Sequence, residues 1–293
     1  MPRASIILPV YNTVSFVWEA IHSILAQTYS DFELIIIDDG STDGSAFVIS
    51  QITDPRVVKI FHSTNQGLVA TLNEGFNRAT GEYIVRMDSD DISTPDRLDV
   101  QISFMDQNPL IDVCGAAFTT SSGGALKVNP ASHEEIRTWL LFHCCICHPA
   151  TIIRNSMIHR LNIQYDSSYP HAEDYELWNR LASQVQIANL PISLLYYRQH
   201  KGQVSIQHRA IQDDTARRIR QRQFSQLGLK LSDEENQMML NILEFKINPY
   251  DYNCYTKAVG FANWVLDQNR KYQIYNQELL SMAFSRCISH LPY

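Results

Sequence analysis

Residues 81–91, Gly-Glu-Tyr-Ile-Val-Arg-Met-Asp-Ser-Asp-Asp, place three carboxylates directly after an apolar run. The run has the pattern of a buried strand. A buried strand that ends in so much like charge needs a positive partner, and a hard divalent cation with oxygen ligands would provide one. The carboxyl ends of strands are also where an open α/β sheet forms its ligand crevice. The alternative is a solvated acidic turn that caps the next helix, and this stretch alone does not separate the two.

The composition of the chain is that of a folded protein. It has 293 residues, 45% of them hydrophobic and 19% charged, which is enough for one large or two modest domains. The net charge of −7 argues against a nucleic-acid partner held through its phosphates. The sequence has no apolar stretch near the roughly 20 residues that span a bilayer, and its start lacks the apolar run of a signal peptide. We therefore expect a cytoplasmic protein.

Cysteine spacing raises the alternative of a zinc site. Three of the six cysteines lie between His143 and His148. Zinc sites usually draw on two separated ligand pairs, and the other cysteines are isolated. We therefore interpret residues 140–153 as buried, strand-like chain in which the thiols act as small hydrophobic groups.

The first half of the chain alternates strands with helices. Apolar runs predict strands over 5–10, 32–37, 57–61 and 82–87. Helical spacing and start signals predict helices over 14–26, 44–51, 67–78 and 95–107. This alternation predicts an α/β fold with a mostly parallel, Rossmann-like central sheet. The sequence has neither the Gly-x-Gly-x-x-Gly turn of dinucleotide binders nor a P-loop.

The second half is mixed and then helical. A helix is predicted over 172–183 and strands over 187–190 and 193–197. Beyond residue 207 the pattern predicts amphipathic helices. We expect one α/β domain over residues 1–205, with halves at 1–110 and 111–205, and a C-terminal helical region over 206–293.

Eight short motifs follow one another over residues 4–205. They are Ile-Ile-Leu-Pro-Val-Tyr-Asn at 6–12, Gln-Thr-Tyr-Ser-Asp-Phe-Glu-Leu at 27–34, Ile-Asp-Asp-Gly-Ser-Thr-Asp at 37–43, Asn-Gln-Gly at 65–67, the stretch 81–91, Pro-Asp-Arg-Leu at 95–98, Ala-Glu-Asp-Tyr-Glu-Leu-Trp at 172–178 and Tyr-Arg-Gln-His at 197–200. In these motifs and their order the chain resembles the family 2 glycosyltransferases, which have the nucleotide-sugar-binding fold called GT-A. The helical region lies outside the resemblance.

The resemblance implies that the half at 1–110 binds the nucleotide of a sugar donor. In this half it implies that Asp39 accepts the ring N–H of the nucleobase, that Tyr11 packs against the base and that Pro9 lines the site. Asn65 and Gly67 belong to the same donor-binding set. Uracil, thymine and guanine all offer such an N–H, so this contact does not select the base. Asp39 also suits a turn acid that hydrogen-bonds nearby backbone.

For the acidic cluster, the resemblance assigns Asp88 to the ribose side of the donor, Ser89 to donor binding and Asp90 to a metal ion, Mn²⁺ or Mg²⁺. Such an ion offsets the charge of the donor diphosphate and acts on it as a Lewis acid. Asp91 either caps the following helix or contacts the sugar. His200 is expected to contact the metal or the diphosphate, since imidazole also suits Mn²⁺, although a lone histidine is more often structural.

Glu173 and Asp174 open the helix predicted over 172–183, where acids also complement the helix dipole. The resemblance implies that, in inverting members, the aspartate of this pair is the general base. An acceptor hydroxyl must lose a proton as it attacks the anomeric carbon, and a carboxylate within hydrogen-bond reach is the usual base. We expect Asp174 to be this base and Glu173 to position donor or acceptor hydroxyls.

The resemblance therefore implies an inverting, metal-dependent glycosyltransferase. It would move a hexosyl or N-acetylhexosaminyl group from a nucleotide-diphosphate sugar, by family expectation a UDP-sugar, to a glycan or lipid-linked glycan in bacterial polysaccharide or glycolipid assembly. One alternative is a non-catalytic nucleotide-sugar-binding scaffold. Another is a sugar nucleotidyltransferase, although the glycine-rich loop of that class is missing at residues 9–13.

The C-terminal region contains a basic run, Arg-Arg-Ile-Arg-Gln-Arg at 217–222. We interpret it as a solvated helix face. The alternative is a patch for anionic lipid or a lipid-diphosphate acceptor, with peripheral contact at the inner face of the membrane. A homodimer interface is a further alternative for these helices.

Overall fold

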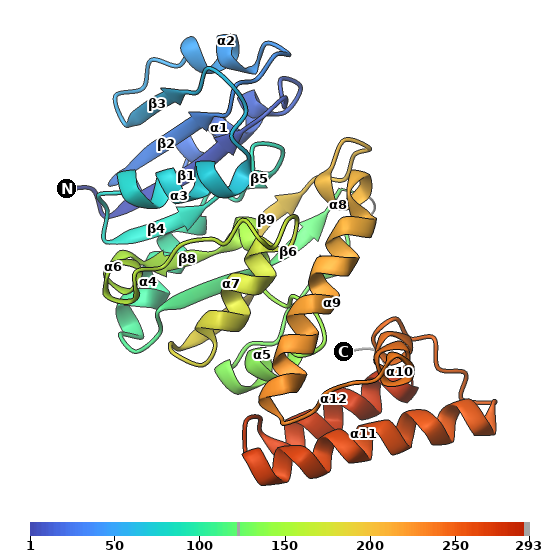
Figure 1. Cartoon of the computed structure of the whole chain (residues 1–293). Coiled ribbons are helices and arrows are strands. Elements are labelled where there is room, and N and C mark those ends of the chain that lie inside the picture. The colour runs from blue at the N-terminus through green and yellow to red at the C-terminus, as the bar shows by residue number, and fades with distance from the viewer. Residues whose placement is uncertain (122–123, 290–293) are drawn as a thin grey trace.

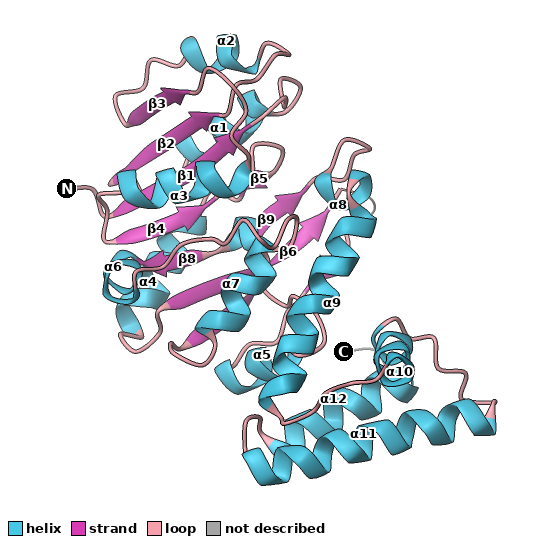
Figure 2. Cartoon of the chain, viewed as in Figure 1, coloured by secondary structure: helices cyan, strands magenta, loops and turns pink. Residues whose placement is uncertain are grey.

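A single sheet of nine strands lies at the centre of the computed structural model, which describes residues 1–121 and 124–289 (Figures 1 and 2). The strand order is β3-β2-β1-β4-β8-β6-β9-β5, with β7 paired to β6. The strands are β1 (Ala4–Val10), β2 (Phe32–Asp38), β3 (Val57–Phe61), β4 (Tyr83–Arg86), β5 (Ile92–Ser93), β6 (Val113–Thr120), β7 (Leu126–Lys127), β8 (Ile152–Arg154) and β9 (Ile187–Tyr197).

The amino-terminal half of the sheet is parallel. β1 pairs with β2 and β4, and β2 pairs with β3, all in parallel. Nearly all residues of β1 and β2 are buried, as expected for continuous apolar strands covered on both faces. The register aligns Val10 with Asp38, so the carboxyl ends of β1 and β2 meet at one edge. The predicted Rossmann-like sheet is confirmed, and antiparallel pairs such as β4 with β8 occur in its second half.

Helices cover both faces of the sheet and continue beyond it (Figure 2). Alternate residues of β1 face two cores: Ile7 packs in the core that includes α3, and Ile6 in the core that includes α1 and α4. Gly75 lets α3 lie close to β1, because a Cβ there would be 2.5 Å from Ile7 Cγ2. The helices are α1 (Val17–Leu25), α2 (Ser45–Ser50), α3 (Leu68–Arg78), α4 (Arg97–Gln107), α5 (His133–Trp139), the 3₁₀ helix η1 (His148–Ala150), α6 (Asn155–Leu161), α7 (Glu173–Leu181), α8 (Val204–Gln207), α9 (Arg209–Gln226), α10 (Asp233–Leu243), α11 (Tyr252–Tyr272) and α12 (Gln277–Ser289).

Two details of the second half differ from prediction. Residues 140–147 are buried for the most part, but they form turns and loop rather than strand, with Phe142 N–H bonded to Trp139 O at 2.8 Å. Backbone groups that bond within a turn have no need of a strand partner. The strands predicted over 187–190 and 193–197 are one strand, β9, which bulges between Leu190 and Ser193. Pro191 lies in this bulge, where its missing N–H costs no ladder bond.

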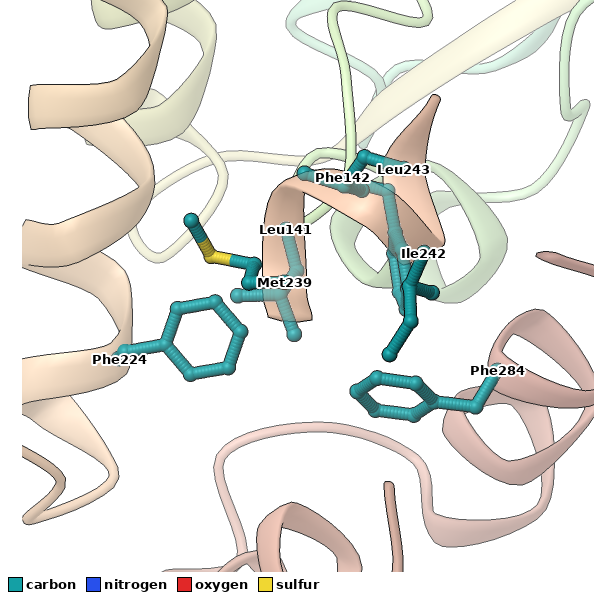
Figure 3. Close-up of a pocket in the computed structure, with 7 residues that line it drawn as sticks. All are labelled: Leu141, Phe142, Phe224, Met239, Ile242, Leu243 and Phe284. Atoms are coloured by element: carbon teal, nitrogen blue, oxygen red, sulfur yellow. The ribbon is translucent and has the colours of Figure 1, made fainter. Parts of the chain in front are cut away.

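The C-terminal helices share a hydrophobic core with the sheet's second half. Side chains from α9, α10 and α12 meet the turn after α5, and the space between them is too small for a water molecule (Figure 3). The side chains that line this seam are Leu141, Phe142, Phe224, Met239, Ile242, Leu243 and Phe284. None of the helices within the described ranges is long and apolar enough for a membrane span.

Candidate active site

Three carboxylates gather where β4 ends. Asp88, Asp90 and Asp91 each place one carboxylate oxygen within 4.8 Å of the other two. Asp88 and Asp90 are half-buried, whereas Asp91 is 1% exposed. The structure thus brings together the three acids that the sequence singled out.

A buried arginine anchors the chain beneath this cluster. Arg97, the first residue of α4, is fully buried and donates to Arg86 O at 2.8 Å and Thr151 O at 3.3 Å. These carbonyls belong to the end of β4 and the chain before β8, so Arg97 ties three segments together. Burial lowers the pKa of Arg97 to about 10.

Asp91 is a buried acid with an unused oxygen. Its Oδ1 accepts the Arg198 N–H at 2.9 Å, and its Oδ2 has no hydrogen-bond partner among the described residues. Burial raises the pKa of Asp91 to about 9, and the charges of Asp88 and Asp90 add to the shift. A bound cation would favour the ionised carboxylate at this position.

The loop after β9 contacts two acids of the cluster, Asp90 and Asp91. His200 Nε2 lies 2.9 Å from Asp90 Oδ2, and its ring packs 4.5 Å from the Phe16 ring. The Arg198 guanidinium lies over the same Phe16 ring and forms an ion pair with Glu19 of α1. The predicted metal residues Asp90 and His200, 110 positions apart, are therefore in direct contact.

Glu173 and Asp174 lie at the start of α7. Burial raises the pKa of Asp174, and burial together with the Asp174 charge raises the pKa of Glu173 to about 7. Asp174 Oδ1 accepts its neighbour's backbone N–H at 2.7 Å, and Oδ2 lies 3.7 Å from the Cys144 thiol. An acid whose pKa approaches neutrality is suited to accept a proton at neutral pH.

Arg86 couples the two acidic groups, although it is not among the site residues predicted from the sequence. It is buried and forms an ion pair with Asp88. Burial raises the pKa of Asp88, the Asp174 charge raises it further, and Arg86 opposes both effects. Arg86 also opposes the upward shift in the pKa of Asp174. Asp88 and Asp174 are therefore near enough to sense each other's charge.

The donor set of this site fits a divalent ion. Oxygen ligands, a half-buried position and an unpartnered carboxylate oxygen on Asp91 are the features that hard cations such as Mg²⁺ or Mn²⁺ require. The carboxylates of Asp88, Asp90 and Asp91 meet here, and the ion pair from Arg86 compensates that of Asp88.

Asp39, the residue directly after β2, is an acid whose carboxylate is fully engaged. Asp39 is 3% exposed, and its carboxylate accepts the N–H groups of Gln66 and Gly67, both at 2.8 Å. Its Oδ1 also lies 2.7 Å from His62 Nδ1, and His62 Nε2 lies 2.8 Å from Glu74 Oε2. These are the bonds expected of a turn acid, and they hold the turn at 65–67 against β2. Contact of Asp39 with a nucleobase stays a prediction.

The other predicted donor-binding residues surround these strand ends. Pro9 is buried in β1, Tyr11 just after it is 48% exposed, and Asn65 is exposed. Gly67 has φ +91°, a conformation that favours glycine, and it donates the bond to Asp39. Ser89 is buried and accepts the Thr13 hydroxyl at 2.9 Å, which links the end of β4 to the loop after β1.

His62 was not anticipated from the sequence. Burial lowers its pKa, but the hydrogen bonds to Asp39 and Glu74 outweigh burial, so the pKa of His62 is raised overall. A charged imidazole donates to both carboxylates at once. A single histidine after a strand carries no pattern that would reveal this bridge.

Comparison with known proteins places the chain in a family. The sequence model of glycosyl transferase family 2 matches residues 5–160, more than half of the chain, and the chain belongs to this family. It is 30% identical over 297 aligned positions to an uncharacterized glycosyltransferase of Haemophilus influenzae, with 91% of this chain and 92% of that protein covered. The chain is thus a glycosyltransferase of family 2.

Solved structures share its fold. TarS 1–349 of S. aureus, solved in complex with UDP-GlcNAc, superposes with a TM-score of 0.62 at 18% identity, over 98% of this chain and 88% of that one. The mannosyltransferase PcManGT of Pyrobaculum calidifontis, solved in complex with GDP-Man and Mn²⁺, superposes with a TM-score of 0.63 at 14% identity, over 99% and 88%. The predicted glycosyltransferase fold is confirmed.

Proposed function

We propose that this chain transfers a sugar from a nucleotide-diphosphate donor to an acceptor hydroxyl with inversion at the anomeric carbon. The observation that carries the proposal is the meeting of two acid groups, one at the end of β4 and one at the start of α7. They differ in chemistry: Asp88, Asp90 and Asp91 form a cluster that would hold a cation, and Asp174 is a half-buried acid with a raised pKa.

Asp174 is the proposed general base. Its carboxylate takes the proton of the acceptor hydroxyl while the hydroxyl oxygen forms a bond to the anomeric carbon. The bond from that carbon to the diphosphate oxygen breaks, and its electron pair leaves with the nucleoside diphosphate. Attack by one nucleophile from the opposite face inverts the configuration. Glu173 is placed beside Asp174 to orient sugar or acceptor hydroxyls.

The leaving diphosphate needs positive charge. Asp90, with Asp88, Asp91 and His200 nearby, would hold Mn²⁺ or Mg²⁺, which when bound supplies a Lewis acid for this charge. At the other strand ends, Asp39, Tyr11 and the turn at 65–67 are proposed to hold the nucleobase.

The donor is proposed to be a UDP-sugar that carries a hexosyl or N-acetylhexosaminyl group. TarS with UDP-GlcNAc and PcManGT with GDP-Man support a nucleotide sugar and leave uridine and guanosine donors both to be tested. The proposed acceptor is a glycan or lipid-linked glycan of bacterial polysaccharide or glycolipid assembly, met in the cytoplasm or at the inner face of the membrane. The family assignment favours glycosyl over nucleotidyl transfer.

Release of nucleoside diphosphate from a panel of UDP- and GDP-sugars tests the proposal. The assay is run with Mn²⁺ or EDTA and with mixed glycan and lipid-linked acceptors, beside Asp90→Ala and Asp174→Asn. We expect metal-dependent release from one donor that both variants lose. If the wild type and both variants bind a donor but none of them releases nucleoside diphosphate, the scaffold alternative would be favoured. The absence of donor binding would overturn the proposal.

A further inference from the structure

The helix α9 lies alongside α7 and the loop that leads into it (Figure 1). This loop, residues 162–172, ends directly before Glu173 and Asp174. It carries a residue in an uncommon conformation, His171 with φ +61°. A backbone of this kind persists only where its surroundings hold it.

A buried acid joins α9 to α7. The Glu176 side chain is 2% exposed and accepts from Arg180 of its own helix at 3.1 Å and from Arg222 of α9 at 3.0 Å. Glu176 lies one turn after Glu173. Removal of one partner from a buried charge cluster leaves the remaining charge uncompensated, so this contact constrains where α7 lies.

Further contacts hold the loop. Arg218 Nη2 donates to Ser168 O at 3.1 Å, and Arg222 Nη1 lies 3.3 Å from the Tyr169 hydroxyl. Both guanidinium groups lie 5.4 Å from the centre of the Tyr169 ring. Gln212 donates to His171 O at 2.7 Å.

The start of α9 adds a ring contact. His208, the residue before α9, stacks on His171 with ring centres 4.3 Å apart and planes within 4° of parallel. Together with Gln212, this contact holds the strained residue two positions before Glu173.

We propose that α9 is a positioning element of the acceptor site, in which Arg222, Arg218 and Gln212 hold α7 and residues 164–171 so that Asp174 meets the acceptor hydroxyl. This inference rests on the proposed role of Asp174. It assigns a function to the basic run at 217–222, whose arginines contact the protein itself. Arg220, for example, is buried with Nη1 3.5 Å from Phe142 O.

Arg217 provides a matched control. It lies in the same run, its ion pair is with Asp214 of the same helix, and both side chains are about half-exposed. Arg217→Ala removes the same charge as Arg222→Ala without changing a contact to Glu176 or to the loop at 162–172. Arg222→Lys keeps the positive charge but loses the planar guanidinium group.

The experiment combines hydrogen exchange with kinetics on the full-length chain. Amide exchange of residues 164–176 is measured for the wild type, Arg222→Ala, Arg222→Lys, Gln212→Ala and Arg217→Ala, with thermal unfolding as a check on folding. Binding of UDP and GDP with Mn²⁺ and kcat with the best donor and acceptor are measured in parallel. Gln212→Ala removes one neutral hydrogen bond and keeps the test open if Arg222→Ala fails to fold.

We expect faster exchange at 164–176 in Arg222→Ala and Gln212→Ala, unchanged nucleotide affinity and a kcat about 10- to 100-fold lower for Arg222→Ala, since small misplacements of a catalytic group have effects of this size. Arg222→Lys should recover part of the loss, and Arg217→Ala should match the wild type.

Wild-type exchange and kcat in both Arg222→Ala and Gln212→Ala would overturn the proposal. The proposal would also be overturned if Arg222→Ala lost nucleotide affinity and kcat together and Arg222→Lys showed the same loss. Failure of wild-type nucleotide binding would instead count against the proposed function, and the exchange data would still report on α9.

Discussion

Two strands that flank β1 in the sheet, β2 and β4, are each followed by a buried acid, Asp39 and Asp91, and the fold treats these two acids in opposite ways. At the end of β2, Asp39 is fully engaged by His62 and by backbone N–H groups of the 65–67 turn. At the end of β4, Asp91 keeps a buried oxygen without a partner among the described residues, and its pKa is raised to about 9.

The difference shows how to separate a shaping acid from a ligand-binding acid. A carboxylate that accepts several protein donors fixes backbone and is satisfied without a ligand. A group of carboxylates with raised pKa values is destabilised until a cation or a proton arrives. An acid of the first kind positions the backbone of a binding surface. Acids of the second kind mark where a cation or a proton binds.

The largest effect is expected from the acid of α7. Asp174→Asn keeps shape and removes the proton acceptor, so kcat should fall by about 10²- to 10⁴-fold with unchanged donor affinity. Single-turnover transfer and donor titration measure the two quantities separately. A variant with more than a tenth of wild-type kcat would remove Asp174 from the role of base.

Mn²⁺ should bind at the acids after β4 and not at Asp39 after β2. Mn²⁺ at about 100 times its Kd should stabilise the wild type by about 2.7 kcal/mol, because binding to the folded state alone shifts unfolding. The shift should vanish in Asp90→Asn and persist in Asp39→Asn, as thermal unfolding with Mn²⁺ or EDTA would show. Equal Mn²⁺ shifts in the two variants would erase the distinction drawn between β4 and β2.

The pH dependence of sugar transfer should reflect the raised pKa values of Glu173 and Asp174. A carboxylate base works only when ionised, and the pKa of Glu173 is raised to about 7 with that of Asp174 also raised. The value of kcat/KM should therefore rise about tenfold per pH unit below the raised pKa of Asp174, which lies above the usual range of an aspartate, and level off above it. Initial rates from pH 5 to 9 measure the profile, and a flat profile from pH 5 to 7 would contradict the assignment.

The smallest effect is expected from the replacement of His62 beside β2, and it concerns the free energy of unfolding. His62 has a raised pKa, so its stabilising contribution is complete below about pH 6.5 and is lost as pH rises through the raised folded-state value. His62→Gln should reduce the free energy of unfolding by about 1–3 kcal/mol at pH 6 and by less at pH 9. Urea unfolding at both pH values tests this.

His22→Gln, at an exposed position, serves as the control for that measurement, since the His22 ring lies 2.9 Å from Trp18 O of its own helix and packs at a tilt against the Trp18 ring. A His62→Gln loss that is constant with pH, or equal to that of His22→Gln, would show that His62 does not act as a charged bridge.

Local pattern was enough for much of the molecule. The strands and helices up to residue 107, apart from the short strand β5, follow from apolar spacing, because each element's buried face is encoded over a few neighbouring residues. The acids at 88–91 and 173–174 could be located because they interrupt apolar segments at the ends of elements. Asp90 of the first segment lies 2.9 Å from His200, so this segment meets the loop after β9.

The sequence by itself determined the alternation of strands and helices in the first 107 residues, the parallel half of the sheet and the family, since these depend on short patterns along the chain. The tertiary structure alone decided which charges are compensated. Arg86 between two acid groups, His62 between Asp39 and Glu74, and Arg222 on Glu176 depend on contacts that have no periodic signal in the sequence. The desolvation that sets the pKa of a carboxylate is a property of everything packed around it, and it becomes visible only once the chain is folded.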